Sequence, residues 1–145
     1  MATLKVQGIG PDDPLWHWVP GPRAVSDAAP SDNVWIRLVD LPSALAARGY
    51  DGACDVVVSV TDELLPANAG SWRIRVADGE AEATRSTADP ELALDVSALG
   101  AAWLGAANLV AMHRAGLVTE HRPDAVRELW RALRADVSPT PTCGF

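Results

Sequence analysis

The sequence predicts an α+β fold, with a mixed, mainly antiparallel sheet and helices packed mostly on one of its faces. Two stretches, 54–61 and 71–77, place successive side chains alternately on an apolar and a more polar face. Such alternation is typical of a sheet that buries one face. The pattern later changes to a helical period, most clearly at 123–135, where an apolar stripe faces a charged side. We therefore expect helices to cover the apolar face of the sheet.

Each element has a local signal. Pro42 favours a helix start and Gly49 a helix end. The sequence Asp78-Gly79 is typical of a tight hairpin turn, and Pro123 is expected in the first turn of the last helix. The expected strands are 34–40, 54–61, 71–77, 80–86 and 91–96, with candidates at 2–9 and 117–120, and the expected helices are 42–48, 97–104, 108–115 and 123–135, with a single turn at 23–27.

The length, net charge and cysteine content of the chain indicate which partners and which compartment to expect. The chain has 145 residues, which favours one domain, and a net charge of −7 with Lys5 as its only lysine. Nucleic acid and anionic membrane surfaces are disfavoured as partners, because both need a basic footprint, whereas a cationic partner is favoured. Cys54 and Cys143 form no disulfide framework, and neither a leader nor a membrane-spanning segment is expected. We expect a cytoplasmic protein.

The sequence contains no catalytic constellation of its own. The three histidines and two cysteines lack the short spacing of a metal site, so no metal is expected. No glycine-rich phosphate loop follows a strand, and no cofactor site is expected in this chain. The carboxylate pairs at 12–13 and 62–63 are interpreted as solvated charges in turns.

Six tryptophans are unusual beside one Phe and one Tyr. Trp35, Trp72, Trp103 and Trp130 lie at core-facing phases, and ordinary core packing is the favoured interpretation. The alternative is an apolar ligand cavity between the sheet and short, glycine-containing helices. Its expected lining residues are Trp35, Trp72, Leu99, Trp103, Leu109 and Met112.

Several motifs occur in an ordered series: Trp-x-Arg-Leu-Val-Asp at 35–40, Asn-Ala-Gly at 68–70 before a tryptophan strand, and Leu-Asp-Val-x-x-Leu-Gly-Ala-x-x-Leu-Gly at 94–105. Together with a C-terminal Phe, they resemble the C-terminal domain of Eis-type (enhanced intracellular survival) N-acetyltransferases, which is similar to sterol carrier protein. The resemblance covers residues 13–145. It implies a lead-in at 1–33, resembling the end of a missing upstream domain followed by a turn-rich linker, and a sterol-carrier-like domain at 34–145 with a tail at 136–145.

The resemblance also implies a role for the chain's end. In this family the terminal carboxylate acts as general base in the acetyltransferase site, and Phe145 is the matching position. Acetyl-coenzyme A would then be the cofactor of the parent enzyme, and a cationic amine, such as an aminoglycoside or lysine, the substrate. The short ending at 143–145 leaves two interpretations level, a functional tail and a free tail.

Three hypotheses remain open. The first is an accessory domain, inactive alone, whose partners are missing N-terminal acetyltransferase domains. The second is a stand-alone carrier of a lipid or other apolar ligand. The third is a structural domain for assembly of the parent enzyme, with a homo-oligomer as a candidate partner. Both a fragment and a complete protein are compatible with the sequence.

Overall fold

The computed structural model of the protein describes residues 6, 10, 12–19 and 34–140. The chain divides into two compact units. One unit comprises Met1–Trp35 with Asp136–Phe145 and contains the short helix α1 (Leu15–Trp18). The other, Ile36–Ala135, contains the sheet and the remaining helices. The strand expected at 2–9 and the helical turn expected at 23–27 lie outside the described residues, apart from Val6.

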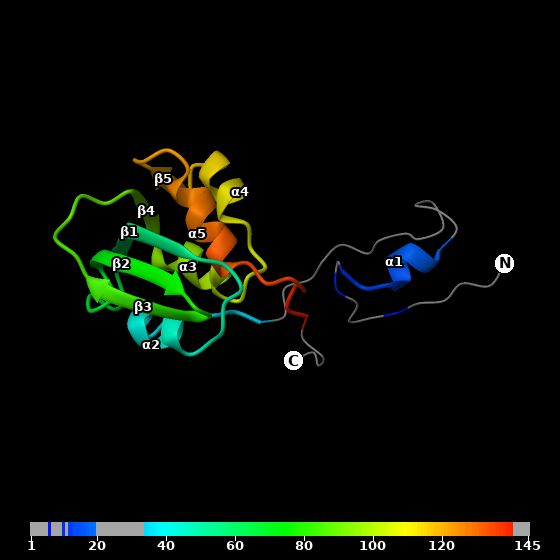
Figure 1. The fold of residues 1–145 in the computed structure, drawn as a ribbon. Coiled ribbons are helices and arrows are strands. Elements are labelled where there is room, and N and C mark those ends of the chain that lie inside the picture. The colour runs from blue at the N-terminus through cyan, green and yellow to red at the C-terminus, as the bar shows by residue number, and fades with distance from the viewer. Residues whose placement is uncertain (1–5, 7–9, 11, 20–33, 141–145) are drawn as a thin grey trace. The chain divides into compact units, whose positions relative to one another are not determined.

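A five-stranded mixed sheet forms the centre of the larger unit (Figure 1). Its strands are β1 (Cys54–Thr61), β2 (Gly70–Ala77), β3 (Glu80–Arg85), β4 (Leu92–Asp95) and β5 (Val118–Glu120), in the order β3-β2-β1-β4-β5. Only the β1–β4 pair is parallel; the other three pairs are antiparallel. The predicted fold class, a mixed and largely antiparallel α+β domain, is confirmed.

The sheet buries one face. Val56 and Val58 of β1 and Ile74 of β2 are fully buried, whereas Arg73 and Arg75 on the opposite face are exposed. Four helices cover the buried face, and α3 and α5 are seen behind the strands in Figure 1. They are α2 (Leu41–Ala46), α3 (Val96–Trp103), α4 (Leu109–Arg114) and α5 (Ala125–Leu133). The alternation in the sequence therefore identified the buried face of the two central strands correctly.

The turn between β2 and β3 follows its sequence signal. Asp78 has φ of 54° and Gly79 has φ of 84°. Positive φ at both central residues is the geometry of a type I′ turn, whose twist matches that of the flanking strands. This turn sets the β2–β3 register, in which Ala77 lies opposite Glu80.

Three expectations about the elements are wrong. Residues 34–40 form no strand, and Trp35, expected to face the core, is 86% exposed. Pro123 lies before α5 rather than in its first turn, because the helix begins at Ala125 after Asp124, whose φ of 67° is left-handed. The chain is thereby redirected immediately before the helix.

Candidate functional site

Asn68 lies at the centre of a buried polar network that joins two loops. Its side-chain amide nitrogen donates to the carbonyls of Leu38 (3.0 Å) and Val39 (3.3 Å), and its oxygen accepts from the backbone N–H of Leu41 (3.1 Å). Asn68 is only 2% exposed. The backbone at residues 38–41 is therefore bound by a side chain instead of a neighbouring strand, which explains why the residues that lead into α2 form no β-strand.

Asp62 completes the network at the end of β1. Its side chain has no exposed surface, and it accepts from Asn68 Nδ2 (3.1 Å), from the backbone N–H groups of Leu64 (3.1 Å) and Leu65 (2.9 Å), and from Arg37. Burial alone would raise the pKa of Asp62. The hydrogen bonds from Leu65, Asn68 and Leu64 and the positive charge of Arg37 outweigh burial, so the pKa lies below its ordinary value of 3.8.

Trp72 and Arg85 close the network on the sheet side. The indole Nε1–H of Trp72 donates to the carbonyl of Asn68 at 2.7 Å, and the guanidinium of Arg85 stacks 3.8 Å from the centre of the indole ring. Arg85 also donates to the carbonyls of Ala67 and Ala69. The loop between β1 and β2 is thus held from both sides.

This network is structural rather than catalytic. Three donors bind Asp62 Oδ1 and Asn68 binds Oδ2, and the side chain has no exposed surface. A buried carboxylate with a lowered pKa is a poor general base, because a substrate cannot reach it and it holds a proton weakly. The interpretation of Asp62 as a solvated loop charge is therefore wrong. A signal was available, since Asp62 continues the inward phase of Val56, Val58 and Val60.

The structure does not bring together all the residues expected to line an apolar cavity. Leu99 and Leu109 have no exposed surface, and Trp72 is 6% exposed. Trp103 and Met112 are half-buried and pack against the core, while Trp35 lies in the other unit. The indole of Trp103 donates to the carbonyl of Ala44 at 2.8 Å, which ties α3 to α2. Five of the six residues thus belong to the core or its margin, and Trp35 does not join them.

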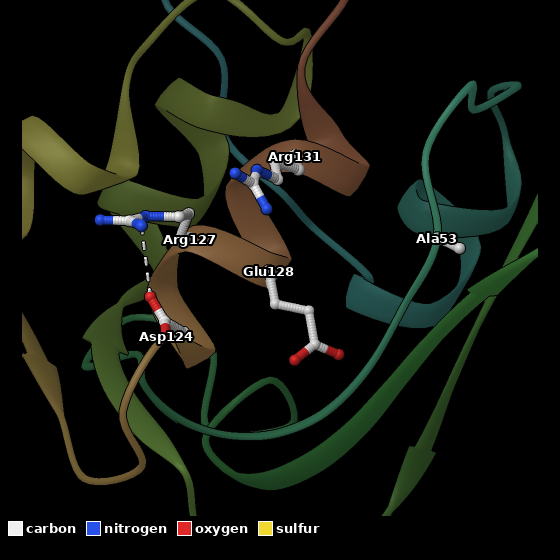
Figure 2. A pocket seen from close by; sticks show the side chains of 5 residues that line it. All are labelled: Ala53, Asp124, Arg127, Glu128 and Arg131. Atoms are coloured by element: carbon white, nitrogen blue, oxygen red, sulfur yellow. Dashed lines mark ion pairs between the residues drawn. The ribbon is translucent and has the colours of Figure 1, made fainter.

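A pocket of about 340 Å³ lies along α5 instead (Figure 2). Four of its five lining residues are charged and come from α5 and the residue before it; the fifth, Ala53, lies just before β1. They are Ala53, Asp124, Arg127, Glu128 and Arg131. Figure 2 shows Arg127 paired with Asp124. Arg127 Nη1 lies 3.4 Å from Asp124 Oδ1. The pocket's lining does not suit an apolar ligand.

Glu128 is already engaged beside this pocket. It accepts from the backbone N–H of Asp55 (3.1 Å) and from Arg122 (2.8 Å), and Arg122 also binds Glu91 (2.5 Å). Glu91 in turn accepts from the N–H of Val57 at 2.9 Å. These bonds connect α5 and the loop before it to the backbone N–H groups of Asp55 and Val57 in β1. They therefore stabilise the fold.

Other expected chemistry gives no site in the described part of the chain. No group of three or more His, Cys, Asp or Glu residues is placed there to hold a metal ion. Burial raises the pKa of the Cys54 thiol to about 12, so this thiol is unsuited to nucleophilic chemistry. No described helix is long and apolar enough to cross a bilayer. Phe145, the expected catalytic residue, lies outside the described residues.

Comparison with known proteins agrees with this framework. The model of the sterol carrier protein domain family matches residues 41–143. An uncharacterized N-acetyltransferase of Streptomyces coelicolor is 37% identical over 144 residues, which are 99% of this chain and 35% of the relative. N-acetyltransferase Eis of Mycobacterium tuberculosis is 30% identical over 130 residues, 88% of this chain and 31% of the relative.

A solved structure extends the comparison to three dimensions. Eis1 of Mycobacterium abscessus superimposes with a TM-score of 0.78 and 40% identity, covering 92% of this chain and 33% of that protein. The chain thus spans about a third of the length of the relatives it matches. The chain belongs to the sterol carrier protein domain family and resembles the C-terminal domain of Eis-type N-acetyltransferases.

Proposed function

We propose that this chain is the C-terminal accessory domain of an Eis-type N-acetyltransferase that acts in the cytoplasm on a cationic amine, such as an aminoglycoside or a lysine. The observation that carries the proposal is the match to relatives named N-acetyltransferases over nearly the whole chain but only about a third of their length. The remaining two thirds of the relatives would correspond to the domains that bind acetyl-coenzyme A. The chain alone is then inactive.

Its contribution to chemistry would be the carboxylate of Phe145. An α-carboxyl group has a pKa of about 3.5, so it is ionised at neutral pH and can accept a proton from an amine held within about 2.6–3.2 Å. The net charge of −7 also favours a cationic substrate. Two buried side chains of the described part are unsuited to the role of base: Asp62 has a lowered pKa and no exposed surface, and burial raises the pKa of the Cys54 thiol to about 12.

The experiment uses the enzyme that carries this chain at its C-terminus. Adding two residues after Phe145 displaces the carboxylate and should lower turnover by about 10²–10⁴-fold, the usual contribution of a general base. Phe145→Ala is the matched control, because it removes the side chain but keeps the carboxylate in place. Unimpaired turnover in the extended enzyme would contradict the proposed role.

Inactivity of the 145-residue chain has a separate test. Calorimetric titration with acetyl-coenzyme A should give no heat of binding, because no phosphate-cradling loop is present in the sequence. Micromolar binding corresponds to about −8 kcal/mol and needs a formed site. A signal of that size would refute the assignment of the cofactor site to other domains.

The carrier function is the alternative. It requires an apolar cavity of at least about 300 Å³. The pocket along α5 reaches that volume but is lined mainly by charged side chains, and Leu99 and Leu109 fill the space between sheet and helices. These observations favour the accessory domain. Saturable binding of a fluorescent fatty acid, displaced by unlabelled lipid, would instead support the carrier.

A further inference from the structure

The smaller unit joins the two ends of the chain. The backbone N–H of Ser138 donates to Asp12 Oδ2 at 2.7 Å, a contact between residues 126 positions apart. The hydroxyl of Thr140 donates to the carbonyl of Ser138 at 3.3 Å. The tail bends at 136–137 and is bound just after that bend, at Ser138, by a carboxylate, an acceptor that makes stronger hydrogen bonds than a neutral oxygen does.

Gly10 and residues 12–18 are joined by hydrogen bonds that can hold this carboxylate in place. The carbonyl of Gly10 accepts both from the backbone N–H of Asp13 (3.2 Å) and from the indole Nε1–H of Trp16 (2.8 Å). Asp13 Oδ1 accepts from the N–H of Leu15 at 2.8 Å, at the start of α1. Asp12 therefore projects from a turn that is fixed on both sides by hydrogen bonds.

Gly10 also permits close approach of the tail. A Cβ atom at this position would overlap the hydroxyl oxygen of Thr140. The missing side chain at residue 10 therefore leaves room for the Thr140 hydroxyl in the rotamer that donates to Ser138. The Gly10–Thr140 contact and the Asp12–Ser138 hydrogen bond both place residues 138–140 against Gly10 and residues 12–18.

We propose that Gly10 and residues 12–18 form a clip that fixes the C-terminal tail at 138–140, with Asp12 and Gly10 as positioning residues. The biological role of the clip rests on the proposed function. Five residues follow Thr140, so a tail held there can place its carboxylate only within about 18 Å of the clip. Fixing the starting point of a flexible segment lowers the entropy lost when its end enters a site.

The test is made on the whole 145-residue chain with a nitroxide label on Cys143. Cys54 is buried and its thiol pKa is about 12, so it should escape labelling. Cys143 is three residues beyond Thr140, hence within about 11 Å of it. In the clipped tail the label should broaden the NMR signal of the Trp16 indole N–H, which itself donates to Gly10.

Asp12→Ala and Gly10→Val should each reduce this broadening. Loss of a solvent-exposed hydrogen bond to a carboxylate lowers the population of the bound state by up to about fivefold. The matched control is Asp51→Ala, which removes an exposed carboxylate from the other unit and should leave the broadening unchanged. Amide signals of residues 54–61 report whether each variant remains folded.

Two outcomes separate this inference from the proposed function. Unchanged broadening in both Asp12→Ala and Gly10→Val would overturn the clip, whatever the terminal carboxylate does. Broadening that is reduced in these variants, combined with full turnover after extension at Phe145, would support the clip and refute the catalytic role. Gly10→Ala adds the smallest possible side chain and should weaken the contact in the same direction as Gly10→Val.

Discussion

Replacing Asn68 by Ala would remove the centre of the polar network. Four hydrogen bonds are lost at once: to the carbonyls of Leu38 and Val39, to Asp62, and from the N–H of Leu41. Asn68 and Leu41 are buried, so water cannot readily replace these partners. The backbone around Leu38 and Leu41 depends on Asn68, because the 36–41 segment has no strand partner.

The expected destabilisation follows from the groups left behind. A buried donor or acceptor without a partner costs about 1–3 kcal/mol. The N–H of Leu41, the carbonyl of Leu38 and Asp62 Oδ2 are the buried groups of this set, whereas the bond to Val39 is only partly buried. Three such groups give about 3–9 kcal/mol, a large share of the roughly 5–15 kcal/mol that stabilises a domain.

Urea unfolding followed by tryptophan fluorescence measures this cost. Asn108→Ala is the matched control, since Asn108 is exposed and its side chain caps α4 by accepting from Val110 (2.9 Å) and Ala111 (3.2 Å). Loss of an exposed cap costs about 1 kcal/mol. The reasoning fails if Asn68→Ala destabilises the protein no more than Asn108→Ala does.

Three further measurements address individual residues. The pKa of Asp62 is lowered despite its burial, so the ionised carboxylate stabilises the folded state at pH values above the ordinary aspartate pKa. This stabilisation is lost as the pH falls through the pKa of the folded state. Asp62→Asn should therefore flatten the decline of the unfolding free energy between about pH 5 and 2. Trp72→Ala should cost about 3–5 kcal/mol in urea unfolding, and Trp103→Ala less, because Trp103 is only half-buried; equal costs would contradict this difference in packing. In a Cys143→Ser variant, Cys54 should react with a thiol reagent at pH 8 only after unfolding, and rapid reaction of the native protein would show that it is accessible.

The strands could be predicted because burial on one face leaves a period of two in the sequence. The same signal misidentified residues 34–40. Leu38 is buried and Ile36 partly buried, so the segment is extended as its alternation indicates. Alternation cannot show what its backbone binds, however, and here Asn68, 30 positions after Leu38, provides the partner.

The candidate site was harder to predict than the fold. Asp62 was interpreted as solvated because Asp commonly occurs in turns. Its burial depends on Arg37, on Asn68 and on two backbone N–H groups that converge only in the folded chain. Local sequence contains the inward phase of Asp62 but not the number of donors around it, and that number decides between a structural and a catalytic carboxylate.

The residues that carry the family resemblance are chiefly those that build the framework. Asn68 organises two loops, and a Cβ on Gly100 would lie 3.0 Å from the carbonyl of Ile36. Gly105 has φ of 84°, and a Cβ there would overlap the backbone nitrogen of Ala135. Selection for the fold alone would retain such residues, so their presence supports the architecture and leaves the activity to be tested. That test belongs at Phe145, which lies outside the described residues.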